Sequence, residues 1–357
     1  MGDHLPVETV AQKIELSDGQ RARSARPVFI VGCPRSGTTL LYHMILSSGD
    51  FAVLPIETDA FCQFGLKFPN LESLRERRRL LEFWLGSRWY AISGLEPSSI
   101  ESEVLEECRS IGDFLTIVME AMCRQQGVRR WAEKSPAHAL YIPEIKRLIP
   151  NSIFVHIIRD GRDVALSLAN FERLYPFLWV AGQTLPALGM YWKWMVRRAR
   201  RGGKQIGPDY YELNYEDLMQ NPRDTLAALG RFIDHDLDYA RILRAGIGSV
   251  TKPESSFRGV ASSGDFNPVG RWKQKYSAQE LAEFESFAGD CLEESGYILA
   301  SDSSGRRLTS PITLARFFYA SQLESIHWLK NRKTLRHFVG ARGRRRLMSR
   351  RRDQDES

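Results

Sequence analysis

A stretch near the N-terminus combines two glycines, an arginine and three hydroxyl residues in a spacing suited to binding an anion. It reads VGCPRSGTTLL over residues 31–41, and Gly32 and Gly37 are spaced as in the nucleotide-binding pattern G-x-x-x-x-G-K-[ST]. In a turn between a strand and a helix, backbone N–H groups and the helix dipole point at a negative charge. Thr38 stands where the pattern requires lysine, so the cation of the loop is Arg35, whose planar guanidinium can hold two oxygens. Hydroxyl donors come from three residues of the same loop: Ser36, Thr38 and Thr39.

The absent lysine decides which chemistry is expected. In a nucleoside-triphosphate site, the lysine reaches the terminal phosphates and the adjacent hydroxyl holds magnesium. With Arg35 as the cation, we expect transfer of an anionic group without a required metal. A nucleotide-dependent kinase is the alternative, and it predicts ATP binding that depends on magnesium.

A second phosphate-binding pair is expected in SIFVHIIRDGRDVALSLANF, residues 152–171. An apolar run ends at Arg159, a bidentate partner for a phosphate. Ser167 follows eight residues later, about two turns along the next helix. In the kinase alternative, Asp160 at the end of the same run would hold magnesium.

These motifs resemble those of sulfotransferases that use 3′-phosphoadenosine 5′-phosphosulfate (PAPS). PRSGTTLL is similar to the family's loop for the 5′-phosphosulfate, and its arginine form resembles the tyrosylprotein, bacterial and carbohydrate branches. Arg159 with Ser167 resembles the family's 3′-phosphate motif, which distinguishes this donor from ATP. The resemblance implies PAPS as co-substrate, no required metal, and transfer of a sulfuryl group to a hydroxyl or an amine. The loop residues that it places on the donor are Arg35, Ser36, Gly37, Thr38 and Thr39.

Two further stretches extend the resemblance over residues 27 to about 295. YYELNYEDLMQNP implies that Tyr215 packs near the adenine, although a core tyrosine fits the same pattern. NPVGRWKQ is similar to an element that closes over the 3′-phosphate. It implies a donor contact for Gly270 and Arg271 and a packing role for Trp272.

Catalytic residues are expected at the ends of two strands. Lys134 in WAEKSPAH resembles the family's lysine on the transferring group, with an ordinary surface lysine as the alternative. One branch has its histidine base two residues later, where this chain has Pro136. Glu57 in LPIETDAF resembles the base of the tyrosylprotein branch, with a role as an ion-pair partner as the alternative. His138 and His156 are weaker candidates, and His156 lies within a strand, where a core histidine is expected.

The acceptor is not indicated by any motif. The resemblance leaves a small molecule, a carbohydrate, a lipid or a protein tyrosine as acceptor classes. Four aromatic residues are candidates for stacking on an acceptor, with core packing as the alternative: Trp84, Trp89, Tyr90 and Trp179.

The pattern of elements predicts a P-loop-like α/β fold, a three-layer sandwich with a central parallel sheet. The expected strands are 27–31, 51–54, 129–133, 152–158 and 210–214. The expected helices are 38–48, 138–148, 161–171, 222–233 and 277–295. We expect a flexible extension at 1–26, a sulfotransferase domain at 27–300 with a helical insertion at 60–126, and an amphipathic helix and basic tail at 301–357. The Gly/Ser/Pro-rich stretch from Ser249 to Gly270 is expected to be a lid or a disordered loop.

The formal net charge of +7 is concentrated near the C-terminus. Lys330–Arg352 contains eleven Lys and Arg and no acid, and the rest of the chain has 39 basic and 43 acidic residues, a net of −4. We therefore expect no nucleic-acid partner, and we leave open a contact of the basic tail with an anionic membrane. Upstream, residues 311–329 are amphipathic, and packing onto the domain is favoured slightly over membrane docking. The apolar residues with helical spacing are Leu314, Phe317, Phe318, Ile326 and Leu329.

The remaining composition predicts a cytoplasmic setting, with peripheral membrane contact left open. The five cysteines are scattered without a CxxC pair, which favours neither zinc nor a disulfide framework. The N-terminal stretch lacks the apolar region of a secretory signal, and no segment approaches the roughly 20 apolar residues of a membrane span. A sulfotransferase-like protein that binds a membrane without turnover is a further alternative.

Overall fold

The computed structural model describes residues 26–169, 184–251, 267–301 and 310–332. Within them, five strands form one sheet in the order β2-β3-β1-β4-β5, and every neighbouring pair is parallel. The strands are β1 (Val28–Val31), β2 (Phe51–Ala52), β3 (Arg130–Lys134), β4 (Ile153–Ile158) and β5 (Tyr210–Asn214). The predicted parallel α/β architecture is confirmed, and all five predicted strands are present, the second shorter than expected.

The central strands are apolar because both faces of the sheet are covered. Every residue of β1 and β4 is buried, as expected for parallel strands between two helical layers. Val28 and Ile30 face one core, and Phe29 and Val31 face the other. The register places Ile30 between Lys134 of β3 and Val155 of β4, so the carboxyl ends of these strands lie at one edge.

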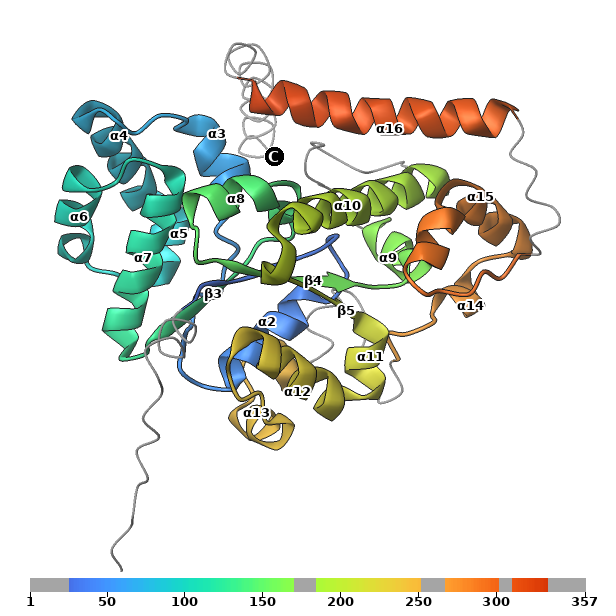
Figure 1. Cartoon of the computed structure of the whole chain (residues 1–357), viewed down its shortest axis with the longest axis horizontal. Helices are drawn as coiled ribbons and strands as arrows, with labels where there is room; N and C mark the ends of the chain where they lie inside the picture. The colour runs from blue at the N-terminus through green and yellow to red at the C-terminus, as the bar shows by residue number, and fades with distance from the viewer. Residues whose placement is uncertain (1–25, 170–183, 252–266, 302–309, 333–357) are drawn as a thin grey trace, which may run out of the picture.

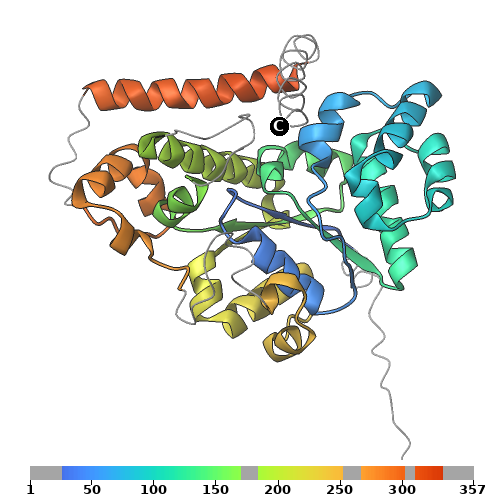
Figure 2. The same cartoon turned by 180° about the vertical axis from the view of Figure 1, so that it is seen from behind.

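Helices cover both faces of the sheet (Figures 1 and 2). One layer contains α2 (Thr38–Ser47), α11 (Tyr215–Gln220), α12 (Pro222–Ile233) and α13 (Tyr239–Ala245). The other contains α7 (Ile111–Gln126), α8 (Ile142–Leu148), α9 (Gly161–Leu168), α10 (Leu185–Ile206) and α15 (Ala278–Glu294). Short 3-10 turns lie at Pro97–Ser99, Pro136–Leu140, Gly207–Asp209 and Gly248–Val250, and the short helix α14 covers Trp272–Lys275.

Several helices begin where the sequence supplies a cap. Ser110 before α7 and Ser277 before α15 both form capping boxes, with Asp113 and Glu280 three residues on. The predicted helix at 138–148 differs from the structure, because a 3-10 turn at Pro136–Leu140 precedes α8 and Pro143 lies in the first turn of that helix.

Region 60–126 consists mainly of helices and lies at the β2–β3 end of the sheet (Figure 1). After a π-helical turn at Ala60–Phe64 come α3 (Gly65–Lys67), α4 (Leu74–Leu85), α5 (Arg88–Ser93) and α6 (Glu101–Glu106), followed by α7. Buried residues of α4, α6 and α7 belong to the same core cluster as α10. Trp84 is one of these core residues.

The last helix packs onto the domain, but not through three of the apolar residues that were expected to do so. Helix α16 (Ser310–Asn331) lies over α10 and packs through Leu323 and His327. Leu314, Phe317 and Phe318 do not pack onto the domain, because they lie on the opposite side of the helix and are 64–70% exposed.

Candidate active site

The predicted anion-binding loop connects the carboxyl end of β1 to the first turn of α2. Arg35 and Gly37 both have left-handed backbone conformations, with φ of 73° and 95°. Gly37 caps α2 without a side-chain hydrogen bond, and the first turn of that helix has no acidic residue. The N–H groups of this turn therefore face the loop without competition from a carboxylate.

Hydroxyl groups of the loop also fit an anion. Ser36 is buried, and among the described residues its Oγ has no hydrogen-bond partner. A buried hydroxyl without a partner costs free energy, so an oxygen of a bound ligand would complete this site. Thr38 is buried at the start of α2, and Thr39 beside it is half-buried.

The two predicted phosphate motifs meet in the fold. The Nε of Arg35 donates to the Oγ of Ser167 at 2.8 Å, although 132 residues separate them. Arg159 is fully buried, and its Nη1 donates to the backbone oxygen of Arg35 at 3.1 Å. This convergence follows from the register, because β1 and β4 are neighbours and both motifs leave their carboxyl ends.

Tyr215 packs directly against the loop. It opens α11 after β5 and is buried, and the Arg159 guanidinium lies 4.7 Å from its ring centroid. A Cβ placed on Gly37 would lie 2.3 Å from Cδ2 of Tyr215, so only glycine fits between ring and backbone. Burial raises the pKa of the Tyr215 hydroxyl to about 12, which leaves the phenol neutral at physiological pH.

The segment 268–272, from the C-terminal part of the domain, contacts the phosphate motifs at the carboxyl edge of the sheet. The Nη2 of Arg159 donates to the backbone oxygen of Pro268. Asp163 accepts from the N–H of Gly270 at 2.7 Å and from that of Trp272 at 3.0 Å. The fold therefore brings the backbone of Gly270 to the phosphate motifs, with Arg271 next to it in the chain.

Trp272 packs, as predicted. It is buried, and the guanidinium of Arg162 lies 3.8 Å from its ring centroid. Asp163 was not singled out by the sequence reasoning. The signal available was its place in the first turn of a helix, between Arg159 and Ser167.

Glu57 and Lys134 form an ion pair at the same edge. The Nζ of Lys134 lies 2.8 Å from Oε1 of Glu57, and the lysine side chain is 10% exposed against 43% for the glutamate. Glu57 is also fixed through its backbone, because the indole N–H of Trp89 donates to its carbonyl oxygen at 2.8 Å. The carboxylate is thus held in place and still open to solvent.

A buried carboxylate joins the two segments that carry this pair. Oε1 of Glu133 accepts from the hydroxyl of Thr58 at 2.7 Å and from that of Ser135. Oε2 of Glu133 lies 2.8 Å from Nδ1 of His138, and this interaction lowers the pKa of Glu133 against the opposing effect of burial. The carboxylate therefore fixes the position of Thr58 beside Glu57 and of Ser135 beside Lys134. The sequence signal for Glu133 was an acidic residue within a strand that is otherwise buried.

Both weaker base candidates are buried in the core. His138 is fully buried, and its Nε2 accepts from the N–H of Phe61 at 3.2 Å while Nδ1 contacts Glu133. His156 is fully buried within β4, with Nδ1 2.6 Å from the hydroxyl of Tyr210. Burial lowers the pKa of His156, so it is a neutral core residue.

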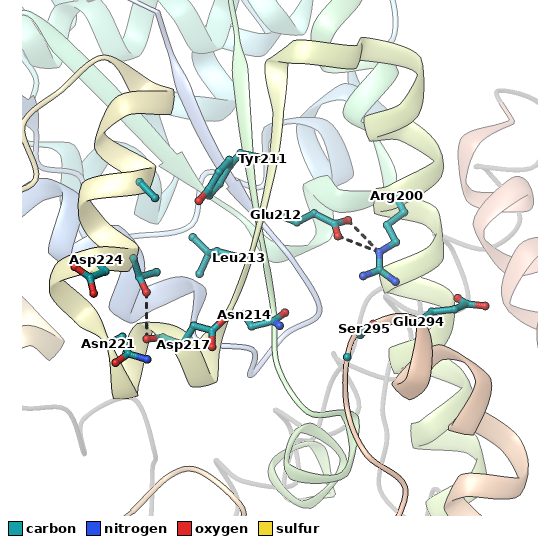
Figure 3. Close-up of a pocket in the computed structure, with 13 residues that line it drawn as sticks. Arg200, Tyr211, Glu212, Leu213, Asn214, Asp217, Asn221, Asp224, Glu294 and Ser295 are labelled. Atoms are coloured by element: carbon teal, nitrogen blue, oxygen red, sulfur yellow. Dashed lines mark hydrogen bonds and ion pairs between the residues drawn. The ribbon is translucent and has the colours of Figure 1, made fainter. Parts of the chain in front are cut away.

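Two cavities lie apart from these residues. A groove of about 620 Å³ runs beside β5 (Figure 3). Tyr211 and Leu213 point to one side of the strand, and Glu212 points to the other, toward Arg200 of α10. A second cavity of about 930 Å³ lies where α3, α8 and α16 meet. Neither lining includes Arg35, Arg159 or Lys134. Among the described residues, no group of three or more His, Cys, Asp or Glu could hold a metal ion.

The structure thus brings the loop after β1, two arginines and a lysine–glutamate pair together at the carboxyl ends of parallel strands. The model of the sulfotransferase family matches residues 27–239, and the chain belongs to this enzyme family. This match covers both phosphate motifs, Lys134 and Tyr215, which confirms the family resemblance.

The relatives in the family are distant. The chain is 28% identical over 269 residues to a "Putative protein-tyrosine sulfotransferase" of Caenorhabditis briggsae, covering 73% of this chain and 85% of the relative. A protein of the same description from Caenorhabditis elegans is 29% identical over 140 residues, covering 38% of this chain and 51% of that relative.

Solved sulfotransferase structures show weaker likeness. The sulfotransferase domain of the Synechococcus PCC 7002 olefin synthase aligns with a TM-score of 0.48 and 18% identity, over 74% of this chain and 94% of that domain. Mouse sulfotransferase SULT7A1 complexed with PAP aligns with a TM-score of 0.42 and 16% identity, over 76% of this chain and 88% of the mouse chain. The family assignment rests on the sequence match.

In the described part of the chain, none of the helices has the length and apolar character needed to cross a membrane.

Proposed function

We propose that this protein transfers a sulfuryl group from PAPS to a hydroxyl, or less readily an amine, and releases adenosine 3′,5′-bisphosphate without a metal. The observation that carries the proposal is the hydrogen bond between Arg35 and Ser167. A donor with phosphate groups at both the 5′ and 3′ positions of one ribose needs two anion sites side by side. The contact between these motifs supplies that arrangement.

The residues present fit this donor. The N–H groups of the loop and Arg35 would hold the 5′-phosphosulfate, with Ser36, Gly37, Thr38 and Thr39 lining the loop. Arg159 and Ser167 would hold the 3′-phosphate, together with Gly270 and Arg271. Tyr215 would pack at the adenine end.

The transfer would proceed in line. The bond between sulfur and the bridging oxygen of the 5′-phosphate breaks while the acceptor oxygen bonds to sulfur. Negative charge on the leaving phosphate is stabilised by Arg35 and the loop N–H groups, and charge on the sulfuryl oxygens by Lys134. The acceptor proton passes to the carboxylate of Glu57, which is exposed and held within 2.8 Å of Lys134.

The descriptions of the relatives support one acceptor class for a first test. The two nematode proteins are described as acting on protein tyrosine, so tyrosine-containing peptides are the first acceptors to test. Small molecules, carbohydrates and lipids with hydroxyl groups form the rest of the screen.

Donor binding is tested by calorimetric titration with adenosine 3′,5′-bisphosphate in the absence of metal, beside ATP with magnesium. Ser167→Ala should weaken bisphosphate binding roughly tenfold to hundredfold, because it removes a hydroxyl partner of a phosphate and of Arg35. Ser286→Ala is the matched control, since this half-buried serine of α15 donates to the backbone oxygen of Glu283 three residues before it. Binding of ATP with magnesium and not of the bisphosphate would favour the kinase alternative.

The base is tested by turnover. Glu57→Gln should lower kcat by about 10²- to 10⁴-fold and leave bisphosphate affinity unchanged, because the amide cannot accept the proton. Glu76→Gln provides the same chemical change at an exposed ion pair with Arg79. Unchanged kcat in Glu57→Gln would refute its role as base. Donor binding without turnover on any acceptor would favour a non-catalytic binding protein.

A further inference from the structure

Helix α16 is attached to the domain along one side only. Leu323 and His327 are buried on that side, and the His327 ring lies edge-on to Tyr141 and Trp194. Arg316 also pairs with Asp290 of α15 at 2.6 Å. The helix therefore has a fixed orientation on the domain, outside α10 (Figures 1 and 2).

The opposite side of α16 exposes large apolar residues. Leu314 and Phe317 are each 70% exposed and Phe318 is 64% exposed, and their i, i+3, i+4 spacing places them together on one face. Trp328 lies further along, is 49% exposed and also lines the cavity where α3, α8 and α16 meet. We call these four residues the outer α16 face. Exposed apolar side chains gathered in this way mark an interaction surface.

The charge around the outer α16 face is positive. The only acid between residues 310 and 331 is Glu324, which bonds Trp194 and Arg198 on the domain side. Arg332 lies over the ring of Trp328 at 4.0 Å. The sequence then continues through Lys330–Arg352, with eleven basic residues and no acid.

We propose that the outer α16 face docks the protein on an anionic membrane surface, an occupant that the positive charge of the sequence after α16 favours. Phenylalanine, leucine and tryptophan enter the boundary between headgroups and acyl chains, and arginine and lysine bind acidic headgroups. A second copy of this chain fits less well. Two such faces would bring basic segments together, and four apolar residues are far fewer than the roughly 20–30 residues a side of a stable protein interface.

The test is co-sedimentation of the full-length protein with vesicles, which needs neither donor nor acceptor. Vesicles of phosphatidylcholine with phosphatidylserine should bind the protein, and vesicles of phosphatidylcholine alone should bind it far less. Added salt should weaken binding, because it screens the headgroup charge. No binding to the phosphatidylserine vesicles would overturn the proposal.

Variants separate the two components of the surface. Phe317→Ser with Phe318→Ser should weaken vesicle binding at least about tenfold, since both rings leave the bilayer boundary. Ile298→Ser is the matched control, because Ile298 is 87% exposed and follows Tyr297, whose hydroxyl bonds Glu216 of α11. Replacing Arg344, Arg345 and Arg346 by Glu should also weaken binding strongly, at about fivefold or more for each lost cation.

Two results would refute the role of the outer α16 face. One is equal vesicle binding by the Phe317/Phe318 double variant and the Ile298→Ser control. The other is a dimer in solution that the double variant converts to a monomer, measured by light scattering without vesicles. That result would assign the face to a second copy. Circular dichroism of each variant checks that α16 remains folded.

Discussion

Gly37→Ala is the sharpest test of how the donor loop is built, because the chain contains a matched control at the other end of the same helix. Gly37 precedes α2 with φ 95°, and Gly49 follows it with φ 88°. A Cβ on Gly37 would lie 2.3 Å from Cδ2 and 2.6 Å from Cε2 of Tyr215, whereas a Cβ on Gly49 would meet no atom within 4 Å. Both variants introduce left-handed strain, and only Gly37→Ala adds a collision.

The expected free energies follow from these contacts. Left-handed strain should lower the free energy of unfolding by about 1–2 kcal/mol in both variants. The collision should lower it by a further 1–3 kcal/mol or so in Gly37→Ala, because the buried ring of Tyr215 must shift. We therefore expect a loss of about 2–5 kcal/mol in Gly37→Ala. Urea unfolding of both variants and the wild type measures the difference.

Donor affinity should change in only one of the two variants. The ring and the loop cannot both keep their positions in Gly37→Ala, so at least one hydrogen bond to the 5′-phosphate is lost. A bond to a charged group is worth about 1.5–3 kcal/mol, which corresponds to roughly tenfold to hundredfold weaker binding of adenosine 3′,5′-bisphosphate. Calorimetric titration measures this affinity, and Gly49→Ala should bind like the wild type.

Equal stability and equal affinity in Gly37→Ala and Gly49→Ala would contradict a role of the Tyr215 ring in fixing the loop. A double-mutant cycle with Tyr215→Ala identifies the cause. If the ring is responsible, adding Gly37→Ala to Tyr215→Ala should cost only the left-handed strain.

Two further predictions follow from carboxylates beside the site. Asp163→Asn should weaken bisphosphate binding about tenfold, because a neutral amide holds the N–H groups of Gly270 and Trp272 less well. Calorimetric titration measures the affinity, and an affinity equal to that of the wild type would contradict a positioning role for Asp163. Burial and then the charge of Glu57 raise the pKa of Asp59 from 3.8 to about 6. Between these values the folded protein keeps a proton that the unfolded chain has lost, so stability falls as pH rises. Urea unfolding at several pH values should therefore show Asp59→Asn gaining stability relative to wild type as pH rises from about 4 to about 6, and a constant difference would contradict the raised pKa.

Local sequence was sufficient for the strands and for the phosphate motifs. The buried strands read as continuous apolar runs because both of their faces are covered, and the loop and Arg159 come directly after two such runs. Backbone N–H groups, a guanidinium and a hydroxyl at a fixed spacing indicate anion binding without knowledge of the rest of the fold. The family and the parallel α/β class were therefore predictable.

Helix α10 was not predictable from its local sequence. No helix was predicted there, and the segment contains Gly202 and Gly203, which disfavour a helix. The structure explains both glycines. A Cβ at Gly202 would lie 3.0 Å from Ile142, and one at Gly203 would lie 2.5 Å from the ring of Tyr210. Close packing against α8 and β5 outweighs the low helix propensity.

The partners within the site were decided by the tertiary structure. The sequence indicated Arg35 and Ser167 separately. Only the pairing of β1 with β4 brings the two side chains into hydrogen-bond contact. Glu57 was predicted as either a base or an ion-pair partner, and the fold places it against Lys134. Contacts between residues so far apart in the chain depend on strand order and register. These are fixed when the whole core packs, and no local pattern of the sequence carries that information.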